Sequence, residues 1–108
     1  MEHPEPFVPE SLASFRSDKM GKSTIFASER ILVGLNCFEA GQEHAVHAHT
    51  GMDKVYQVLE GSGLLLLEGR ELSLETGMMA IAPEGVLHGI RNTGAGRLVV
   101  LAILAPAP

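Results

Sequence analysis

The chain has 108 residues with 13 acidic and eight basic side chains, a formal net charge of −5. Its basic residues do not cluster as they do on a nucleic-acid-binding surface. Apolar residues make up 45% of it, yet its uninterrupted apolar runs, such as residues 63–67, are far shorter than the roughly 20 residues of a membrane span. We therefore expect one domain with one hydrophobic core, and neither nucleic acid nor membrane as a partner.

The first ten residues contain three glutamates and three prolines. They predict an extended lead-in and lack the basic and apolar character of an export leader. Residues 9–15 are expected to form one helical turn with Ser11 as its cap. The lone Cys37 cannot form an internal disulfide, which favours a reducing compartment, and its place within an apolar run predicts a core position. We therefore expect a cytoplasmic protein.

Short apolar runs separated by glycine-containing turns predict β-strands from Ser23 onward. No segment of ten or more residues shows the 3.6-residue period of a helix. Some eight antiparallel strands in about 85 residues must pair or close their edges, which predicts an all-β barrel or a double-sheet jelly roll. The strand material lies at 23–27, 30–41, 43–49, 54–61, 63–69, 70–74, 78–85, 87–92 and 97–105.

This pattern divides the chain into a lead-in at 1–22, one β-barrel domain at 23–105 and a tail at 106–108. Within the domain, Asn92 is expected to hydrogen-bond the backbone at a strand end. Residues 64–67 are expected in the sheet core, while Met78 and Met79 are expected to fill the core or line a pocket.

The histidines carry the chemical signal of the sequence. His47 and His49 are two residues apart, so a strand places both side chains on one face, about 7 Å apart. His88 follows a Pro-x-Gly turn on a distant strand and offers a third imidazole for a divalent metal. His44 is three residues from His47 and is expected to face solvent, and His3 lies in the lead-in; we assign a ligand role to neither.

Residues 41–61 and 77–92 carry the spacings G-x5-H-x-H-x4-K-x6-G and G-x5-P-x-G-x2-H-x3-N. These resemble the two motifs of the cupin superfamily, with the short gap typical of small single-domain bacterial cupins of the conserved-barrel cupin 2 type. The one departure is Lys54, which stands where the family has a metal-binding glutamate.

The resemblance implies an all-β, single-domain double-stranded β-helix, also called a jelly-roll barrel, and a homodimer. It also implies that His47, His49 and His88 correspond to the family's three metal-binding histidines. The cofactor would be a divalent transition metal. Three histidine ligands are compatible with Zn, Fe, Mn, Ni and Cu and do not distinguish among them.

Lys54 makes such a site unusual, because a 2+ ion about 5 Å from an ammonium is repelled by roughly 6–7 kcal/mol at an effective dielectric constant of about 20. Three arrangements would relieve this repulsion. Lys54 could point outward, toward Asp53 or Glu43. A bulge after Gly51 could shift the register so that Asp53 or Gln57 supplies an oxygen ligand. Alternatively, the metal could be weak or absent, and Lys54 could hold an anionic substrate or act as a base of low pKa.

The spacing from Lys54 to Gly61 matches the family and favours the inward arrangement, with Tyr56 and Val58 on the same face as the lysine. Tyr56, the only tyrosine in the chain, would then offer a phenol donor near the metal or substrate, or else serve as a core aromatic.

The expected function is a metal-dependent oxygenase or isomerase acting on a small oxygen-rich or enol-forming molecule. For that function Lys54 and Tyr56 are the candidate catalytic residues, and Lys54 orients a carboxylate or stabilises an enolate. The alternative is a non-catalytic sensor or carrier that binds a small molecule with weak or absent metal. Few other acid–base candidates are expected in the cavity, which favours metal-centred chemistry or plain binding.

Overall fold

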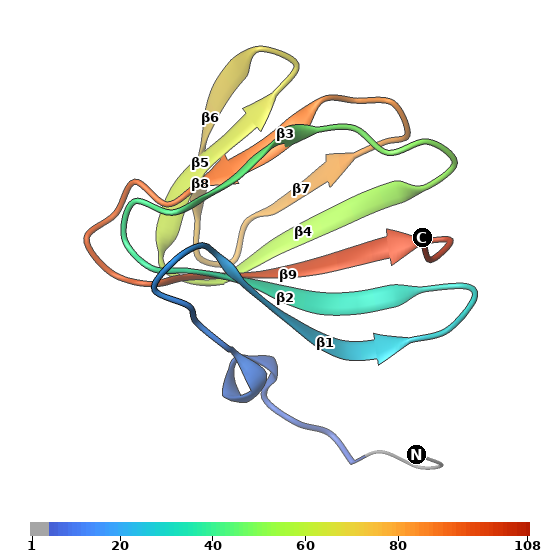
Figure 1. The fold of residues 1–108 in the computed structure, drawn as a ribbon, viewed down its shortest axis with the longest axis horizontal. Helices are drawn as coiled ribbons and strands as arrows, with labels where there is room; N and C mark the ends of the chain where they lie inside the picture. Colours follow the sequence, from blue (N-terminus) through green and yellow to red (C-terminus); the bar gives the residue numbers. More distant parts are fainter. Residues whose placement is uncertain (1–4) are drawn as a thin grey trace.

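The computed structural model describes residues 5–108, and His3 lies outside this range. Strands dominate the described chain (Figure 1), which confirms the all-β class. The strands are β1 Gly21–Ala27, β2 Leu32–Phe38, β3 Glu43–His47, β4 Asp53–Glu60, β5 Ser62–Leu67, β6 Arg70–Glu75, β7 Met79–Ala82, β8 His88–Arg91 and β9 Leu98–Ala105.

The strands form two antiparallel sheets, which Figure 1 shows as two layers. One sheet has five strands in the order β1-β2-β9-β4-β7, and the other has four in the order β3-β8-β5-β6. Several strands pair with strands that are distant in sequence: β2 pairs with β9, and β3 pairs with β8. This double-sheet topology confirms the predicted jelly roll.

The main hydrophobic core lies between the sheets and includes Phe38, Tyr56 and Ile90, all fully buried. A second cluster, formed by Leu35, Cys37 and Val99, contacts the partly buried Ala13 and Phe15 of the lead-in. Strand β2 is therefore covered on both faces. This explains why Cys37 is a core residue, as the sequence predicted.

Two local expectations were wrong. The helical turn exists as a 3₁₀ turn at Pro9–Leu12, but Ser11 is not its cap: Val8 is the N-cap, and the Ser11 hydroxyl donates to its carbonyl oxygen. Met78 and Met79 are not core or pocket residues, since their side chains are exposed and lie outside the cavity described below. No helix in residues 5–108 is long and apolar enough to cross a membrane.

Asn92, at the end of β8, is buried and bonds the backbone as expected. Its Nδ2 donates to the carbonyl oxygens of Phe38, Glu39 and Gly96 at 3.2, 3.0 and 2.9 Å. Its Oδ1 accepts the backbone N–H of Gly94 at 3.0 Å. One side chain thus joins the loop after β2 to the turn before β9.

We predict that Asn92→Ala lowers the free energy of unfolding by about 2–3 kcal/mol, because buried carbonyl groups lose their donor. Asn36→Ala is the matched control. Asn36 is also buried, but its Nδ2 has no hydrogen-bond partner among the described residues, so the loss there should be about 1 kcal/mol or less. Urea unfolding of both variants measures the difference, and equal losses would contradict the role given to Asn92.

Candidate metal and ligand site

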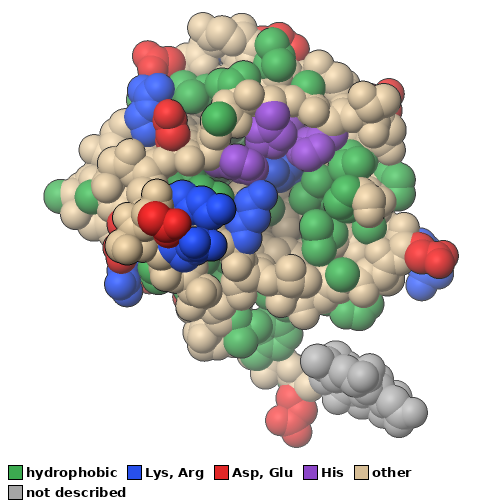
Figure 2. All heavy atoms as spheres, in the orientation of Figure 1, with side chains coloured by type: hydrophobic (Ala, Val, Ile, Leu, Met, Phe, Trp, Pro, Cys, Tyr) green, Lys and Arg blue, Asp and Glu red, His purple; other side chains and the backbone are tan. Residues whose placement is uncertain are grey.

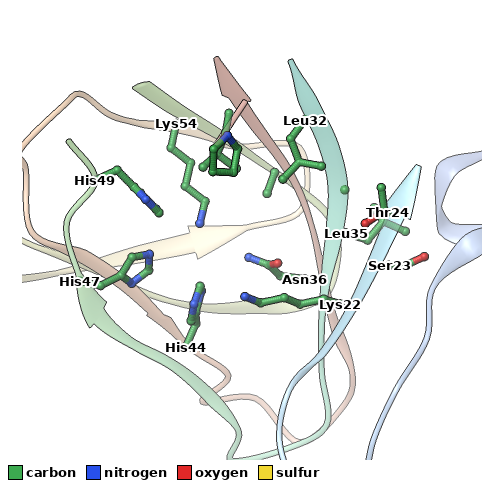
Figure 3. A pocket seen from close by; sticks show the side chains of 14 residues that line it. Lys22, Ser23, Thr24, Leu32, Leu35, Asn36, His44, His47, His49 and Lys54 are labelled. Carbon is green, nitrogen blue, oxygen red and sulfur yellow. The ribbon is translucent and has the colours of Figure 1, made fainter. Parts of the chain in front are cut away.

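A cavity of about 340 Å³ opens between the two sheets. Figure 2 shows the histidine side chains gathered around this hollow, with basic side chains beside them. In Figure 3 the nitrogen-bearing side chains converge from both walls, whereas the Ser23 hydroxyl points away and donates to the carbonyl oxygen of Leu12. The polar lining side chains are Lys22, Ser23, Thr24, Asn36, His44, His47, His49 and Lys54.

The fold brings the three predicted metal-binding histidines together. Antiparallel pairing of β3 with β8 sets His47 opposite His88, and His49 follows two residues after the end of β3. One ring nitrogen from each histidine lies within 4.8 Å of the others. His88 is buried at the base of the group, while His47 and His49 are half-buried and line the cavity.

Hydrogen bonds at the far ring nitrogens fix the orientation of two imidazoles. Nδ1 of His47 lies 2.7 Å from the carbonyl oxygen of Ala45, and Nδ1 of His88 lies 2.8 Å from that of Val86. A carbonyl only accepts, so each Nδ1 carries the proton and each Nε2 presents a lone pair. This backbone support is the arrangement usual for metal-binding histidines.

The free ring nitrogens fit a metal. Nε2 of His49 and Nε2 of His88 are buried and have no hydrogen-bond partner within residues 5–108. Burial, together with the charge of Lys54, lowers the pKa of both rings below the ordinary 6.5. Neutral imidazoles with unused lone pairs are the form that divalent transition metals bind.

His44 corrects one expectation. Its ring lines the cavity and lies 4.4 Å from that of His47, centroid to centroid, although their spacing predicted opposite faces. The cause is a β-bulge, because the β3–β8 register shifts between His44 and His47 and alternation fails there. Burial, with Lys54 and other nearby groups, lowers the pKa of His44 to about 3.

Lys54 points inward and is 4% exposed, on the same face of β4 as the buried Tyr56 and Val58. The inward arrangement is thus confirmed, and the outward alternative was wrong. The shifted register was also wrong, since β4 pairs regularly with β9 from Asp53 to Val58. Asp53 is exposed on the other face, where it accepts the backbone N–H of Glu84 at 2.9 Å. Gln57 shares the face of Asp53, so neither reaches the histidines.

The Lys54 ammonium has no carboxylate partner: the ion pairs of residues 5–108 all involve arginines. Burial, followed by the nearby charge of Lys22, lowers the pKa of Lys54 to about 8. Nζ lies 4.9 Å from the centroid of the Tyr56 ring. The Tyr56 hydroxyl is buried without a partner among the described residues, and burial raises its pKa, so it remains a neutral donor.

Of the polar residues in the cavity lining, five were not predicted from the sequence: Lys22, Ser23, Thr24, Asn36 and His44. One signal was present for Asn36, a polar residue inside the apolar run 31–38. Lys22 had been placed in the lead-in, but β1 already starts at Gly21.

Comparison with known proteins agrees with this architecture. Residues 34–104 match the family model described as "Cupin domain". The crystal structure of TT1209 from Thermus thermophilus is 40% identical and has a TM-score of 0.90 over 100% of both chains.

A curated relative and a solved structure, both from Thermotoga maritima, are also similar. The relative, named "Oxalate-binding protein", is 24% identical over 105 residues, covering 90% of this chain and 86% of the relative. The solved structure, the crystal structure of a predicted oxalate decarboxylase, shares the fold at 22% identity and a TM-score of 0.76, covering 80% of this chain and 79% of that one. Because the family model spans more than half of the chain, this protein belongs to the cupin domain family.

Proposed function

We propose that this cupin binds one divalent transition metal through His47, His49 and His88, and that a small carboxylate-bearing molecule binds between these histidines and Lys54. The observation that carries the proposal is the convergence of three imidazole nitrogens beside a buried ammonium. The histidines lack an anionic neighbour, and the ammonium lacks an ion-pair partner in the described chain.

The donor set suits Zn, Fe, Mn, Ni or Cu, all of which accept imidazole nitrogen. When bound, such an ion supplies a Lewis acid or a redox centre. The backbone carbonyls of Ala45 and Val86 hold the His47 and His88 rings in the orientation that binding needs.

Lys54 makes the site selective for an anion. Its positive charge opposes a bare metal ion, whereas a carboxylate placed between the two is attracted by both. Lys54 would donate to that carboxylate, or to an enolate oxygen that develops from it. Tyr56 is fully buried and not part of the cavity lining, so its unused hydroxyl would be a second donor only for a ligand that reaches below Lys54. The name of the Thermotoga maritima relative, an oxalate-binding protein, supports a small carboxylate as ligand.

Two functions use such a site. The first is a metal-dependent oxygenase or isomerase in which Lys54 and Tyr56 act on the substrate. The second is a non-catalytic binding or sensor protein. The described residues that line the cavity include no aspartate or glutamate, which favours metal-centred chemistry or plain binding over general acid–base catalysis. A homodimer and a cytoplasmic location remain predictions.

Oxygen uptake separates the two functions. If the protein is an oxygenase, iron-loaded wild type should consume oxygen when an enolisable diketone or a thiol is added, and Lys54→Met should slow the reaction. The His49→Ala variant serves as the blank. Tight ligand binding with no uptake, and with no isomerised product by NMR, would favour the binding protein.

We predict about one transition metal per chain in untagged wild type, and a near-complete loss in His49→Ala, because removing one of three ligands disrupts the site. The matched control is His44→Ala, which removes a histidine from the same cavity but outside the trio. Elemental analysis after dialysis measures both. Equal metal content in wild type and His49→Ala would refute the assignment of the trio.

Lys54→Glu should tighten metal binding by orders of magnitude, because a repulsive charge is replaced by an attractive carboxylate at the same inward position. Lys54→Met should give an intermediate affinity, since it removes the repulsion without adding a ligand. Competition with a chromogenic chelator measures the three dissociation constants. Identical affinities in all three proteins would mean that Lys54 does not face the ion.

A further inference from the structure

The cavity wall opposite the three histidines carries its own polar pair. Lys22 on β1 and Asn36 on β2 are direct cross-strand partners, so their side chains lie next to each other on one face of the five-stranded sheet. Both line the cavity, and Figure 3 shows their nitrogen-bearing ends directed toward the space that the histidines and Lys54 also face.

Asn36 is the unusual member of the pair. It is 5% exposed, yet its Nδ2 has no hydrogen-bond partner in the part of the chain that the structure describes. A buried amide donor without a partner costs about 1–3 kcal/mol. A ligand that accepts a hydrogen bond from this donor would recover that cost, which accounts for a polar residue within an otherwise apolar run.

The charge of the wall points to the same kind of ligand. Lys22, which is exposed, and Lys54, which is buried, bring two ammonium groups to one cavity, and its lining residues within 5–108 include no aspartate or glutamate side chain to neutralise them. Neither lysine takes part in the ion pairs of the described chain. A ligand with one anionic group would leave one of these charges unpaired.

We propose that Lys22 and Asn36 form a second anion-binding subsite, so that the ligand carries a carboxylate at the end remote from the histidines. This subsite extends the proposed function. It depends on that function only for the end of the ligand that faces the metal. The ligand class is a short-chain dicarboxylate longer than oxalate.

Two features favour carboxylate over phosphate. Phosphate sites commonly use arginine forks or helix N-termini, and the described cavity lining has neither. The wall around Asn36 also contains apolar side chains, those of Leu32, Ala102 and Leu104, which would contact a short carbon skeleton between two carboxylates. The volume of about 340 Å³ is at the lower end of small-molecule sites and exceeds the needs of a two-carbon ligand.

The test compares succinate with succinamate, which has the same skeleton with one carboxylate replaced by an amide. Calorimetry at fixed pH and ionic strength measures the affinity of each compound, first for metal-loaded and then for chelator-treated protein. We expect wild type to bind succinate about tenfold more tightly than succinamate, the value of one charge-assisted hydrogen bond. Lys22→Met should remove most of this preference, and Asn36→Ala should weaken succinate binding. Lys19→Met removes an equal charge outside this cavity and should change neither the preference for succinate nor its affinity.

Several results would overturn the proposal: equal binding of succinate and succinamate by wild type, an unchanged preference in Lys22→Met, or tighter binding of inorganic phosphate or oxalate than of succinate.

Metal content, measured on the same samples, separates the two proposals. A preference that depends on Lys22 in a protein that never retains metal would support the subsite and refute the metal centre. Retained metal without a preference for succinate that depends on Lys22 would support the metal centre and refute the subsite.

Discussion

The antiparallel pairing of β3 with β8, interrupted by one bulge, decides what this cupin cavity contains. The pairing sets His47 opposite His88, although they are far apart in sequence. The bulge then turns His44 to the same side as His47, where regular alternation would have sent it to solvent. Without this local irregularity His44 would face away from the side of the sheet on which His47 lies.

The buried ammonium of Lys54 imposes the second constraint. In the family's motif, a glutamate at this position would add a negative charge to three neutral imidazoles. Here the same inward position carries a positive charge, held between the Tyr56 ring and the cavity. In the proposed function, the anion that balances this charge would come with the ligand. Metal and ligand binding would then be thermodynamically coupled, because each would reduce the electrostatic cost of the other.

In the proposed function, the two walls of the cavity would divide the recognition of the ligand. The histidines belong to the four-stranded sheet or directly follow one of its strands, whereas Lys22, Asn36 and Lys54 belong to the five-stranded sheet. A bound molecule would therefore bridge the sheets. The full-length similarity to TT1209 concerns the scaffold that holds these walls, and the chemistry depends on the few side chains that face inward.

The sequence by itself determined the all-β class, the approximate strands, the histidine trio and the inward position of Lys54. The fold class and strands follow from the period of two and from glycine-containing turns, which are local in the chain, whereas the histidine trio and the inward Lys54 rest on the resemblance of the motif spacing to the cupin superfamily. Tertiary structure decided the rest. Lys22, Asn36 and His44 reach the cavity through a cross-strand register and a bulge, and neither is encoded in the spacing within one strand. Burial on both faces of β2 likewise hid the significance of Asn36, because a strand covered on both sides shows no alternation.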